Sequence, residues 1–297
     1  MSAQKNHESL GSGMLMLIPQ RQTISPKDYG MNYREVEFTT PDELVLRGWL
    51  INESANKTII MTHFGCRTNR FGYQPKHPPY LLKPYKSEIE FYSVAKHLVK
   101  AGYSVLMYDL RNQGQSDEFQ PDNYNGDTKE PVDLVAAIEF IVSESSPAGK
   151  PIGLLSYSVG ANISFLAMQK HSDAFIRCGV KAMVAVQPLS VGDPLNAIHP
   201  ERSTYRTHKA YSKIHVSDPN PNISLEEAAK SVCIPTRLVQ AKGDPFSDIT
   251  KIVCTFDNIP VEKEMLWLDS HTHRFDGYNW FSKNPQDMLG WFEQHLL

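Results

Sequence analysis

Ser158 lies among small residues in the segment Gly-Leu-Leu-Ser-Tyr-Ser-Val-Gly, which ends at Gly160. An apolar strand pattern precedes this segment, and a helical pattern follows it from Ala161 to Met168. A serine on a sharp strand-to-helix turn exposes its hydroxyl, provided that the residues two positions to either side are small. Gly160 meets this requirement downstream, and Ser156 meets it upstream. The segment therefore predicts that Ser158 is a nucleophile.

A serine hydroxyl is a weak nucleophile until a base takes its proton, and histidine is the usual base. Two histidines, His271 and His273, follow the last apolar run of the sequence, Met265–Leu268. We predict that His273 is the base, because it stands further from the end of the strand, and His271 is the alternative.

A carboxylate is then needed to orient the imidazole and to stabilise its protonated form. Asp244 follows the apolar run Arg237–Gln240 and lies between the serine and the histidine in chain order. We predict that Asp244 fills this role. Asp248, four residues further on, and Asp193, which follows an earlier strand, are the alternatives.

An acyl-transfer reaction also needs backbone N–H groups directed at the oxyanion of its tetrahedral intermediate. The amide of Val159, directly after the nucleophile, is one predicted donor. The second is expected from the loop after the run Thr58–Thr62, where either Phe64 or Gly65 is a candidate. His63, in the same loop, is interpreted as a residue that shapes the loop and not as a second base.

The elements that must position these residues are short apolar strands alternating with amphipathic helices. This pattern predicts an α/β fold with a mostly parallel sheet and helices on both faces. Two alternating runs around Val36 and Trp49 predict an antiparallel hairpin at one edge of the sheet. The continuous apolar runs predict buried strands at Thr58–Thr62, Ser104–Tyr108, Ile152–Leu155, Ala182–Val186, Arg237–Gln240 and Met265–Leu268. Helices are predicted around Phe91–Val99, Leu134–Ile141 and Met288–Phe292.

The composition is that of an ordinary globular protein, with 41% hydrophobic and 21% charged residues among 297. The formal net charge of -3 argues against nucleic acid as a partner. No apolar stretch approaches the roughly 20 residues of a membrane span, and the N-terminus lacks a basic signal region. We therefore expect a cytoplasmic protein.

Neither a metal nor an organic cofactor is predicted. The four cysteines, Cys66, Cys178, Cys233 and Cys254, are widely spaced and form no CxxC pair. No metal-ligand cluster and no glycine-rich phosphate loop occurs in the sequence. The predicted partner is a small-molecule acyl substrate.

Two irregular segments interrupt the rhythm of strands and helices, at about residues 70–86 and 189–224. They are rich in Pro, Tyr, Asn and basic residues and have no strong period. Long insertions of this kind are commonly lids or binding loops. We predict an N-terminal extension over residues 1–32 and one domain over residues 33–297 that carries both insertions.

The sequence resembles the α/β-hydrolase superfamily from about Tyr33 to the C-terminus, close to its single-domain esterase and acyl-peptidase-like members. The segment Tyr108–Ser116 is similar to the superfamily's Asp-x-Arg-Gly-x-Gly-x-Ser loop, and Val232–Asp244 is similar to its Ile-Pro-strand-Gly-x-x-Asp run. Two departures stand out. Ser156 replaces the first glycine of the usual serine motif, and His-Phe-Gly, ending at Gly65, replaces the usual His-Gly.

The resemblance implies an eight-stranded sheet with a small lid and a serine hydrolase that cleaves a carboxylic ester or a thioester through an acyl-enzyme on Ser158. A serine at this position argues against dehalogenase and epoxide-hydrolase chemistry, which use aspartate there. Two alternatives remain open. The same residues serve an acyltransferase that excludes water, and the altered motifs are compatible with a non-catalytic ligand binder.

Overall fold

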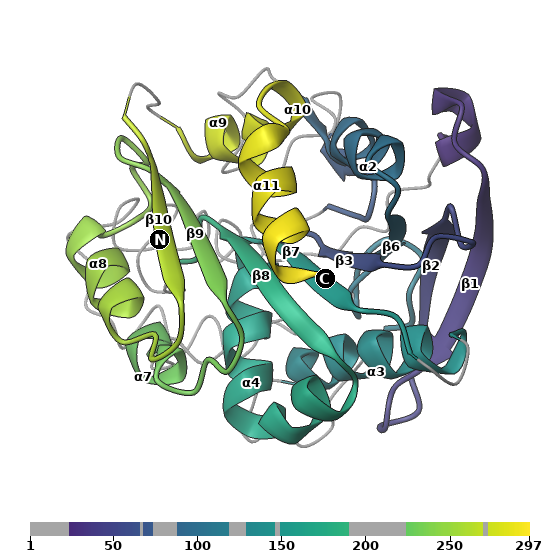
Figure 1. Cartoon of the computed structure of the whole chain (residues 1–297), viewed down its shortest axis with the longest axis horizontal. Helices are drawn as coiled ribbons and strands as arrows, with labels where there is room; N and C mark the ends of the chain where they lie inside the picture. Colours follow the sequence, from purple (N-terminus) through teal and green to yellow (C-terminus); the bar gives the residue numbers. More distant parts are fainter. Residues whose placement is uncertain are drawn as a thin grey trace, which may run out of the picture.

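One twisted β-sheet runs through the centre of the protein (Figure 1). The computed structural model describes residues 24–65, 68–73, 88–118, 129–145, 149–189, 224–269 and 273–297. Within these residues the main sheet has eight strands in the order β1-β2-β6-β3-β7-β8-β9-β10. The strands are β1 (Tyr33–Thr39), β2 (Val45–Ile51), β3 (Thr58–Thr62), β6 (Ser104–Tyr108), β7 (Ile152–Tyr157), β8 (Val180–Val186), β9 (Thr236–Ala241) and β10 (Lys263–Leu268). A separate two-stranded sheet pairs β4 (Gly72–Tyr73) with β5 (Ile89–Glu90).

The strand directions confirm the predicted mostly parallel sheet. β2 is antiparallel to both β1 and β6, whereas the other neighbouring pairs of the main sheet are parallel. The predicted edge hairpin is β1 and β2, in which Val36 pairs with Gly48. Strands β3, β6 and β7 are buried at every position, because helices cover both faces of the sheet. Continuous apolar runs are expected in such strands.

Helices flank the sheet on both sides (Figure 1). The longer ones are α2 (Phe91–Lys100), α3 (Glu130–Ser143), α4 (Val159–Arg177), α8 (Ile249–Asp257) and α11 (Gln286–His295). The shorter ones are η1 (Pro26–Tyr29), α7 (Leu225–Ala229), α9 (Arg274–Tyr278) and α10 (Trp280–Lys283). The predicted helices correspond to α2, α3, α4 and α11, and α2 ends before Gly102, which adopts a left-handed φ of 89°.

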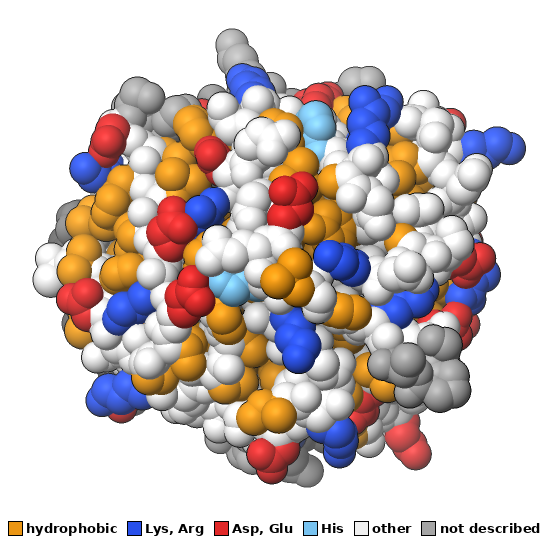
Figure 2. Space-filling view, viewed as in Figure 1, with side chains coloured by type: hydrophobic (Ala, Val, Ile, Leu, Met, Phe, Trp, Pro, Cys, Tyr) orange, Lys and Arg blue, Asp and Glu red, His pale blue; other side chains and the backbone are white. Residues whose placement is uncertain are grey.

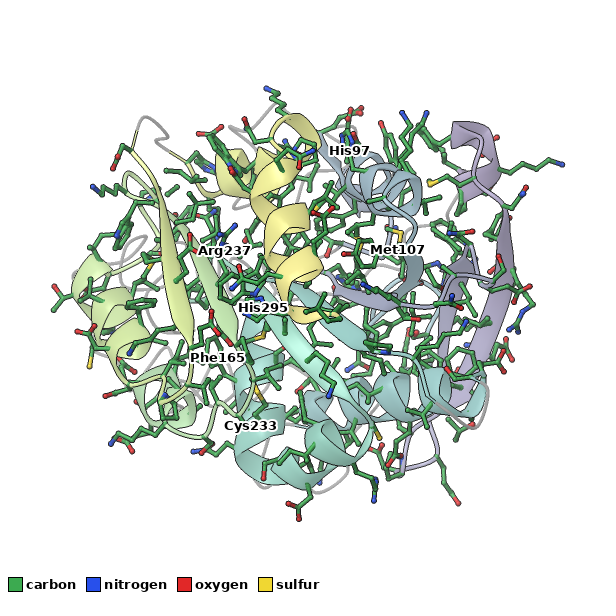
Figure 3. The ribbon with its side chains drawn as sticks, in the orientation of Figure 1. His97, Met107, Phe165, Cys233, Arg237 and His295 are labelled. Atoms are coloured by element: carbon green, nitrogen blue, oxygen red, sulfur yellow. The ribbon has the colours of Figure 1, made fainter. Side chains whose placement is uncertain are left out.

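The core is divided by the sheet into two hydrophobic clusters. One cluster contains residues of α2 and α11 together with Met107 of β6. The other contains residues of α3, α4 and α7, among them Phe165 of α4; Figure 3 labels Met107 and Phe165. Adjacent residues of β6 belong to opposite clusters, because successive side chains of a strand point to opposite faces. Leu106 therefore packs toward α3 and α4, whereas Met107 packs toward α2 and α11.

Most of the predicted extension and insertions lies outside the described residues. The extension is described only from residue 24, the first insertion only up to Tyr73, and the second only at its two ends, Leu189 and Ser224. Their predicted roles remain predictions. No helix within the described ranges is long and apolar enough to cross a membrane. On the face shown in Figure 2, acidic and basic side chains are interspersed.

Candidate active site

Ser158 occupies the turn between β7 and α4, as the sequence predicts. Its backbone is strained, with φ 51° and ψ −110°, a region that residues with a Cβ rarely adopt. The turn is held from both sides. The Ser158 amide donates to Val186 O of β8 at 2.8 Å, and the Ser158 carbonyl accepts from Asn162 N of α4 at 2.9 Å. Strain that the surrounding structure enforces in this way is typical of functional sites.

Different packing contacts explain the small residues two positions before and after Ser158, Ser156 and Gly160. A Cβ on Gly160 would lie 2.5 Å from Thr62 O, so α4 approaches the end of β3 too closely for any other residue. Ser156 is completely buried and donates to Ser164 Oγ at 2.8 Å, because the single proton of Ser164 is directed at Gly160 O. Ser156 therefore fits the position at which the usual motif has glycine, and its hydroxyl joins β7 to α4.

Asp244 lies in the loop after β9 with its side chain fully buried. Its Oδ1 accepts from Phe246 N at 3.0 Å, and its Oδ2 accepts from Ser247 Oγ at 2.7 Å. Arg274 Nη1 forms an ion pair with Oδ2 at 3.3 Å. These contacts hold the carboxylate in one orientation in the protein interior, as an orienting residue requires.

The two alternatives to Asp244 differ from it. Asp248 is exposed, and its Oδ1 accepts from Thr250 N at 2.9 Å as the N-cap of α8. Capping is a sufficient structural reason for an aspartate at this position. Asp193 lies outside the described residues.

His273 is the N-cap residue of α9 and is half-buried. Its amide donates to Asp276 Oδ2 at 3.2 Å, and its Nδ1 accepts from Phe275 N at 3.3 Å. Edge-on contacts with Phe246 and Phe275 fix the plane of the imidazole. The ring thus lies between the Asp244 loop and α9, while the alternative base, His271, lies outside the described residues.

The charges around His273 oppose one another. Burial lowers the pKa of the imidazole below its ordinary value of 6.5, and the cation of Arg274 adds to this effect. The carboxylates of Asp244 and Asp276 act in the opposite direction. Asp244 is therefore close enough to stabilise an imidazolium at His273, although burial keeps the ring neutral at neutral pH.

The loop after β3 lies directly against the first turn of α4. A Cβ on Gly65 would lie 3.0 Å from Val159 Cγ2, so the two backbones that carry the predicted oxyanion donors are neighbours. Phe64 is buried, and its carbonyl is already used as an acceptor by Thr68 Oγ1. The choice between Phe64 and Gly65 as the second donor stays open.

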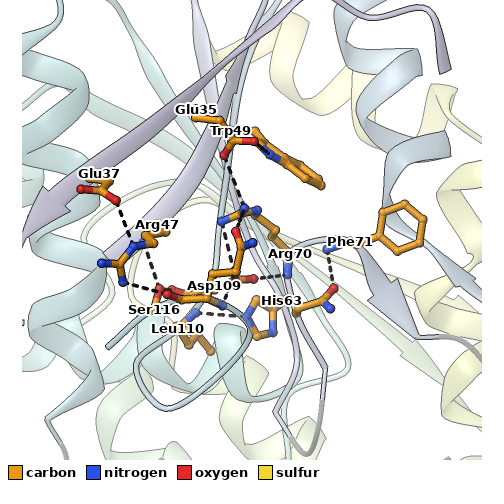
Figure 4. A network of polar contacts seen from close by, with 12 residues as sticks. Glu35, Glu37, Arg47, Trp49, His63, Arg70, Phe71, Asp109, Leu110 and Ser116 are labelled. Atoms are coloured by element: carbon orange, nitrogen blue, oxygen red, sulfur yellow. Dashed lines mark hydrogen bonds and ion pairs between the residues drawn. The ribbon is translucent and has the colours of Figure 1, made fainter. Parts of the chain in front are cut away.

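His63 is buried and neutral in this loop. Its Nδ1 donates to Phe64 O at 2.7 Å. Its Nε2 accepts from Leu110 N at 3.1 Å, as Figure 4 shows. Burial is the main cause that lowers the pKa of His63. With both ring nitrogens occupied by backbone groups, His63 joins the loop after β3 to the loop after β6, which agrees with its predicted role in shaping the loop.

Asp109 clamps the same two loops together (Figure 4). Its carboxylate accepts from Arg70 N at 2.7 Å and from Gln115 N at 2.9 Å, and it forms an ion pair with Arg70 at 3.2 Å. Gly114 has φ 54°, and a Cβ there would lie 2.2 Å from the Asp109 carboxylate. The loop at Tyr108–Ser116, which resembles a loop of the superfamily, therefore holds the predicted oxyanion loop in place through these contacts.

Three buried residues at the site were not identified from the sequence: Gln187, Arg274 and Tyr278. Arg274 Nη2 donates to Gln187 O at 2.8 Å, and Gln187 Nε2 donates back to Arg274 O. Arg274 Nε donates to Tyr278 Oη at 2.7 Å. The available sequence signal was the four-residue spacing of Arg274 and Tyr278, which places both on one face of a helix.

No group of three or more His, Cys, Asp or Glu side chains is arranged to hold a metal ion in the described part of the chain. The predicted site combines an alcohol at Ser158, an imidazole at His273 and a buried carboxylate at Asp244 with the backbone amides of the loop after β3 and of α4. That set of groups can perform nucleophilic acyl transfer.

Several known proteins are similar to this chain in sequence or in fold. Residues 87–219 match the family described as serine aminopeptidase, S33. The esterase Pf2001 of Pyrococcus furiosus superimposes with a TM-score of 0.68 at 23% identity, covering 94% of this chain and 97% of the esterase. The α/β hydrolase GrgF of Penicillium sp. sh18 superimposes with a TM-score of 0.57 at 18% identity, covering 89% of this chain and 99% of GrgF. The chain has the α/β-hydrolase fold.

The sequence is also similar to that of a thiohydrolase. Thiohydrolase apmlB of Arthrinium phaeospermum is 32% identical over 157 residues, which are 53% of this chain and 43% of that protein. The chain thus spans less than half the length of this relative. Together with the fold and the family match, the similarity supports a hydrolase with an α/β fold.

Proposed function

We propose that this α/β hydrolase cleaves a carboxylic ester or a thioester through an acyl-enzyme on Ser158. The observation that carries the proposal is the strained turn at Ser158, which projects from the end of β7 with Gly160 packed on the loop after β3. The burial and ion pairing of Asp244 and the position of His273 beside it add to the support.

In the proposed reaction, Ser158 Oγ attacks the acyl carbon while its proton passes to His273. Asp244 orients the imidazole and stabilises the charge that the ring gains. His273 gives this proton to the departing alcohol or thiol as the acyl-enzyme forms. Water then attacks the acyl-enzyme while one of its protons passes to His273, and His273 gives that proton to Ser158 Oγ as the acid leaves. Proton transfer through Nε2 requires a hydrogen on Nδ1. In the structure Nδ1 accepts a hydrogen bond from Phe275 N, so before the reaction this contact must be replaced by a hydrogen bond from Nδ1–H to Asp244.

The amide of Val159 and one amide of the loop after β3, from Phe64 or Gly65, are the proposed oxyanion donors. Each such donor contributes about 2.7–4 kcal/mol to catalysis in acyl-transfer enzymes. The clamp made by His63 and Asp109 holds the second donor in place without direct contact with the substrate. The proposed substrate class, esters and thioesters, agrees with the names of the esterase and the thiohydrolase to which the chain is similar.

Labelling with a fluorophosphonate tests the nucleophile. We expect one covalent adduct on the folded protein, located at Ser158 by peptide mass spectrometry and lost in Ser158→Ala. Wild-type protein that is folded but takes no adduct at Ser158 would overturn the proposal in favour of a ligand binder.

A panel of p-nitrophenyl esters and acyl thioesters of graded chain length then identifies the substrate class. Product analysis in the presence of a competing alcohol separates the hydrolase from the acyltransferase. The free acid as main product is the expected result, and an ester of the added alcohol as main product would indicate an acyltransferase.

The pH dependence of the reaction should follow His273. Only the neutral imidazole accepts the serine proton, so activity is lost as pH falls through the pKa of His273. Because burial lowers this pKa, the acid limb of kcat/KM is expected to have its midpoint below 6.5. The check is kcat/KM across the acid range with an ester whose leaving group does not titrate there, and a midpoint above 6.5 would contradict it.

A further inference from the structure

Arg274, the residue directly after the predicted base His273, places a buried positive charge beside the predicted acid. Its side chain is 6% exposed, and Nη1 forms an ion pair with Asp244 Oδ2 at 3.3 Å. Nη2 donates to Gln187 O at 2.8 Å, and Nε donates to Tyr278 Oη at 2.7 Å. A charge that is removed from water needs such partners, because its desolvation is costly. The guanidinium is therefore fixed in one place with a terminal nitrogen at Asp244.

Gln187 joins the backbone of Arg274 to the sheet. Gln187 follows β8, adopts a left-handed φ of 51° and is completely buried. Its Oε1 accepts from Ala241 N of β9 at 3.0 Å, and its Nε2 donates to Arg274 O. A Cβ on Gly277 would lie 2.6 Å from the Gln187 side chain, so α9 packs directly against it. The start of α9 is thus tied to the ends of β8 and β9.

The partners of the Asp244 carboxylate come from two different elements. Phe246 N and Ser247 Oγ, which bind Oδ1 and Oδ2 at 3.0 and 2.7 Å, belong to the acid's own loop. The ion pair with Arg274 instead reaches α9, the helix that His273 caps. Through this ion pair the loop that carries the acid is joined to the helix that follows the base.

We propose that Arg274 is a positioning residue for the predicted acid and base. Its guanidinium holds Asp244, and its backbone, which Gln187 anchors, holds the adjoining His273. The proposal rests on the proposed function, because the two residues that it positions act in that reaction. Arg274 transfers no proton itself, since a guanidinium stays charged in proteins. Its contribution is to keep the acid and the base in a fixed relative position.

The charge of Arg274 also acts on the protonation of His273. Together with burial, the cation lowers the pKa of the imidazole, whereas the carboxylates of Asp244 and Asp276 act in the opposite direction. Removing the cation should therefore raise the pKa of His273. Because only the neutral imidazole is active, the acid limb of the pH profile should then move to higher pH. A residue that served packing alone would leave this midpoint unchanged.

Two substitutions separate the charge of Arg274 from its shape. Arg274→Gln removes the charge and keeps a hydrogen-bond donor. We expect kcat to fall by about 10- to 100-fold with KM within about three-fold of wild type, and the acid-limb midpoint of kcat/KM to move to higher pH. Arg274→Lys keeps the charge but loses the planar fork that reaches several partners at once. Its kcat should fall by at least about 10-fold, while its midpoint stays at the wild-type value.

Arg237→Gln is the matched control. Arg237 lies on β9, and its side chain is 15% exposed. Its guanidinium has the same kinds of partners as that of Arg274: the ring of Trp291 at 5.1 Å, the backbone carbonyl of Asp287, and Glu264 in an ion pair at 2.7 Å. Its loss should leave kcat within about two-fold of wild type and the midpoint unchanged. Thermal unfolding of each variant measures the loss of stability separately.

The outcomes distinguish this inference from the proposed function. If Arg274→Gln has the turnover and the midpoint of Arg237→Gln, the positioning role of Arg274 is overturned while the proposed function stands. If Arg274→Gln does not fold, Arg274→Lys decides, and wild-type turnover in that variant overturns the role. If folded wild-type protein takes no fluorophosphonate adduct at Ser158, the proposed function fails and this inference fails with it.

Discussion

Ser158→Ala is expected to lower kcat by about 10⁴- to 10⁶-fold while Tm stays within about 2 °C of wild type. The substitution removes the atom that forms the acyl-enzyme. It keeps the Cβ, so the backbone at φ 51° remains as strained as before and its contribution to stability is unchanged. Steady-state turnover of the best ester from the panel, together with thermal unfolding, checks both parts.

A matched pair of aspartates tests the rest of the predicted triad. Asp244→Asn should lose about 10⁴-fold in kcat, because an amide no longer stabilises the imidazolium or selects the reactive tautomer. Asp248→Asn should remain within about three-fold of wild type, since asparagine caps a helix as well as aspartate does. Retained turnover in Ser158→Ala, or equal losses in the two aspartate variants, would contradict the assignment.

Arg111→Met is expected to destabilise the fold by about 3–5 kcal/mol. The Arg111 side chain is completely buried in the loop after β6, and its Nε lies 2.9 Å from both carboxylate oxygens of Asp133 on α3. Its two terminal nitrogens donate to Asp42 at 2.8 and 3.0 Å. Removing the guanidinium leaves the buried Asp133 carboxylate without the cation that offsets its desolvation.

This loss should depend on pH, because the carboxyl groups near Arg111 can take up protons. Burial raises the pKa of Asp133 to about 6 and that of Glu130 to about 7, and Arg111 opposes both shifts. An acid whose pKa is raised by folding contributes stability that is complete below its unfolded pKa and is lost as pH rises through the folded value. In Arg111→Met both values rise further, so the penalty is largest above pH 7 and smaller near pH 5.

Urea unfolding of wild type and variant at about pH 8 and about pH 5.5 measures this difference. Arg177→Met is the control, since Arg177 forms only a surface ion pair with Glu139, in which the two side chains are 69% and 47% exposed. Its effect should stay below about 1 kcal/mol. A penalty for Arg111→Met that matched the control, or that grew as pH fell, would contradict the account.

Burial on both sides of the sheet is what made the strands predictable. A strand with both faces covered is mostly apolar along its length, and Thr58–Thr62 and Ser104–Tyr108 have in the structure the same bounds as in the prediction. The later strands, β7 to β10, are longer than their predicted runs, and β7 shows one reason. It continues past Leu155 to Tyr157, because Ser164 satisfies the hydroxyl of Ser156 in the interior. A polar residue ended the predicted run but not the strand.

Short elements gave too little periodic signal to be predicted. α9 has five residues and α10 has four, less than the length over which a helical hydrophobic period repeats clearly. The strands β4 and β5 pair with each other, but with two residues each they carry no alternation of their own. These elements depend on what they pack against, which a local pattern does not contain.

The sequence by itself determined the α/β architecture, the turn that carries Ser158 and the chain order of the candidate catalytic residues, because each follows from side chains that are neighbours along the chain. The tertiary structure alone decided that Asp244 is buried while Asp248 caps a helix, and that α9 brings Arg274 to Asp244 and Tyr278 against Phe64. Polar contacts of this kind join residues far apart in sequence. Their energy depends on the path of the whole chain, so no local pattern records them.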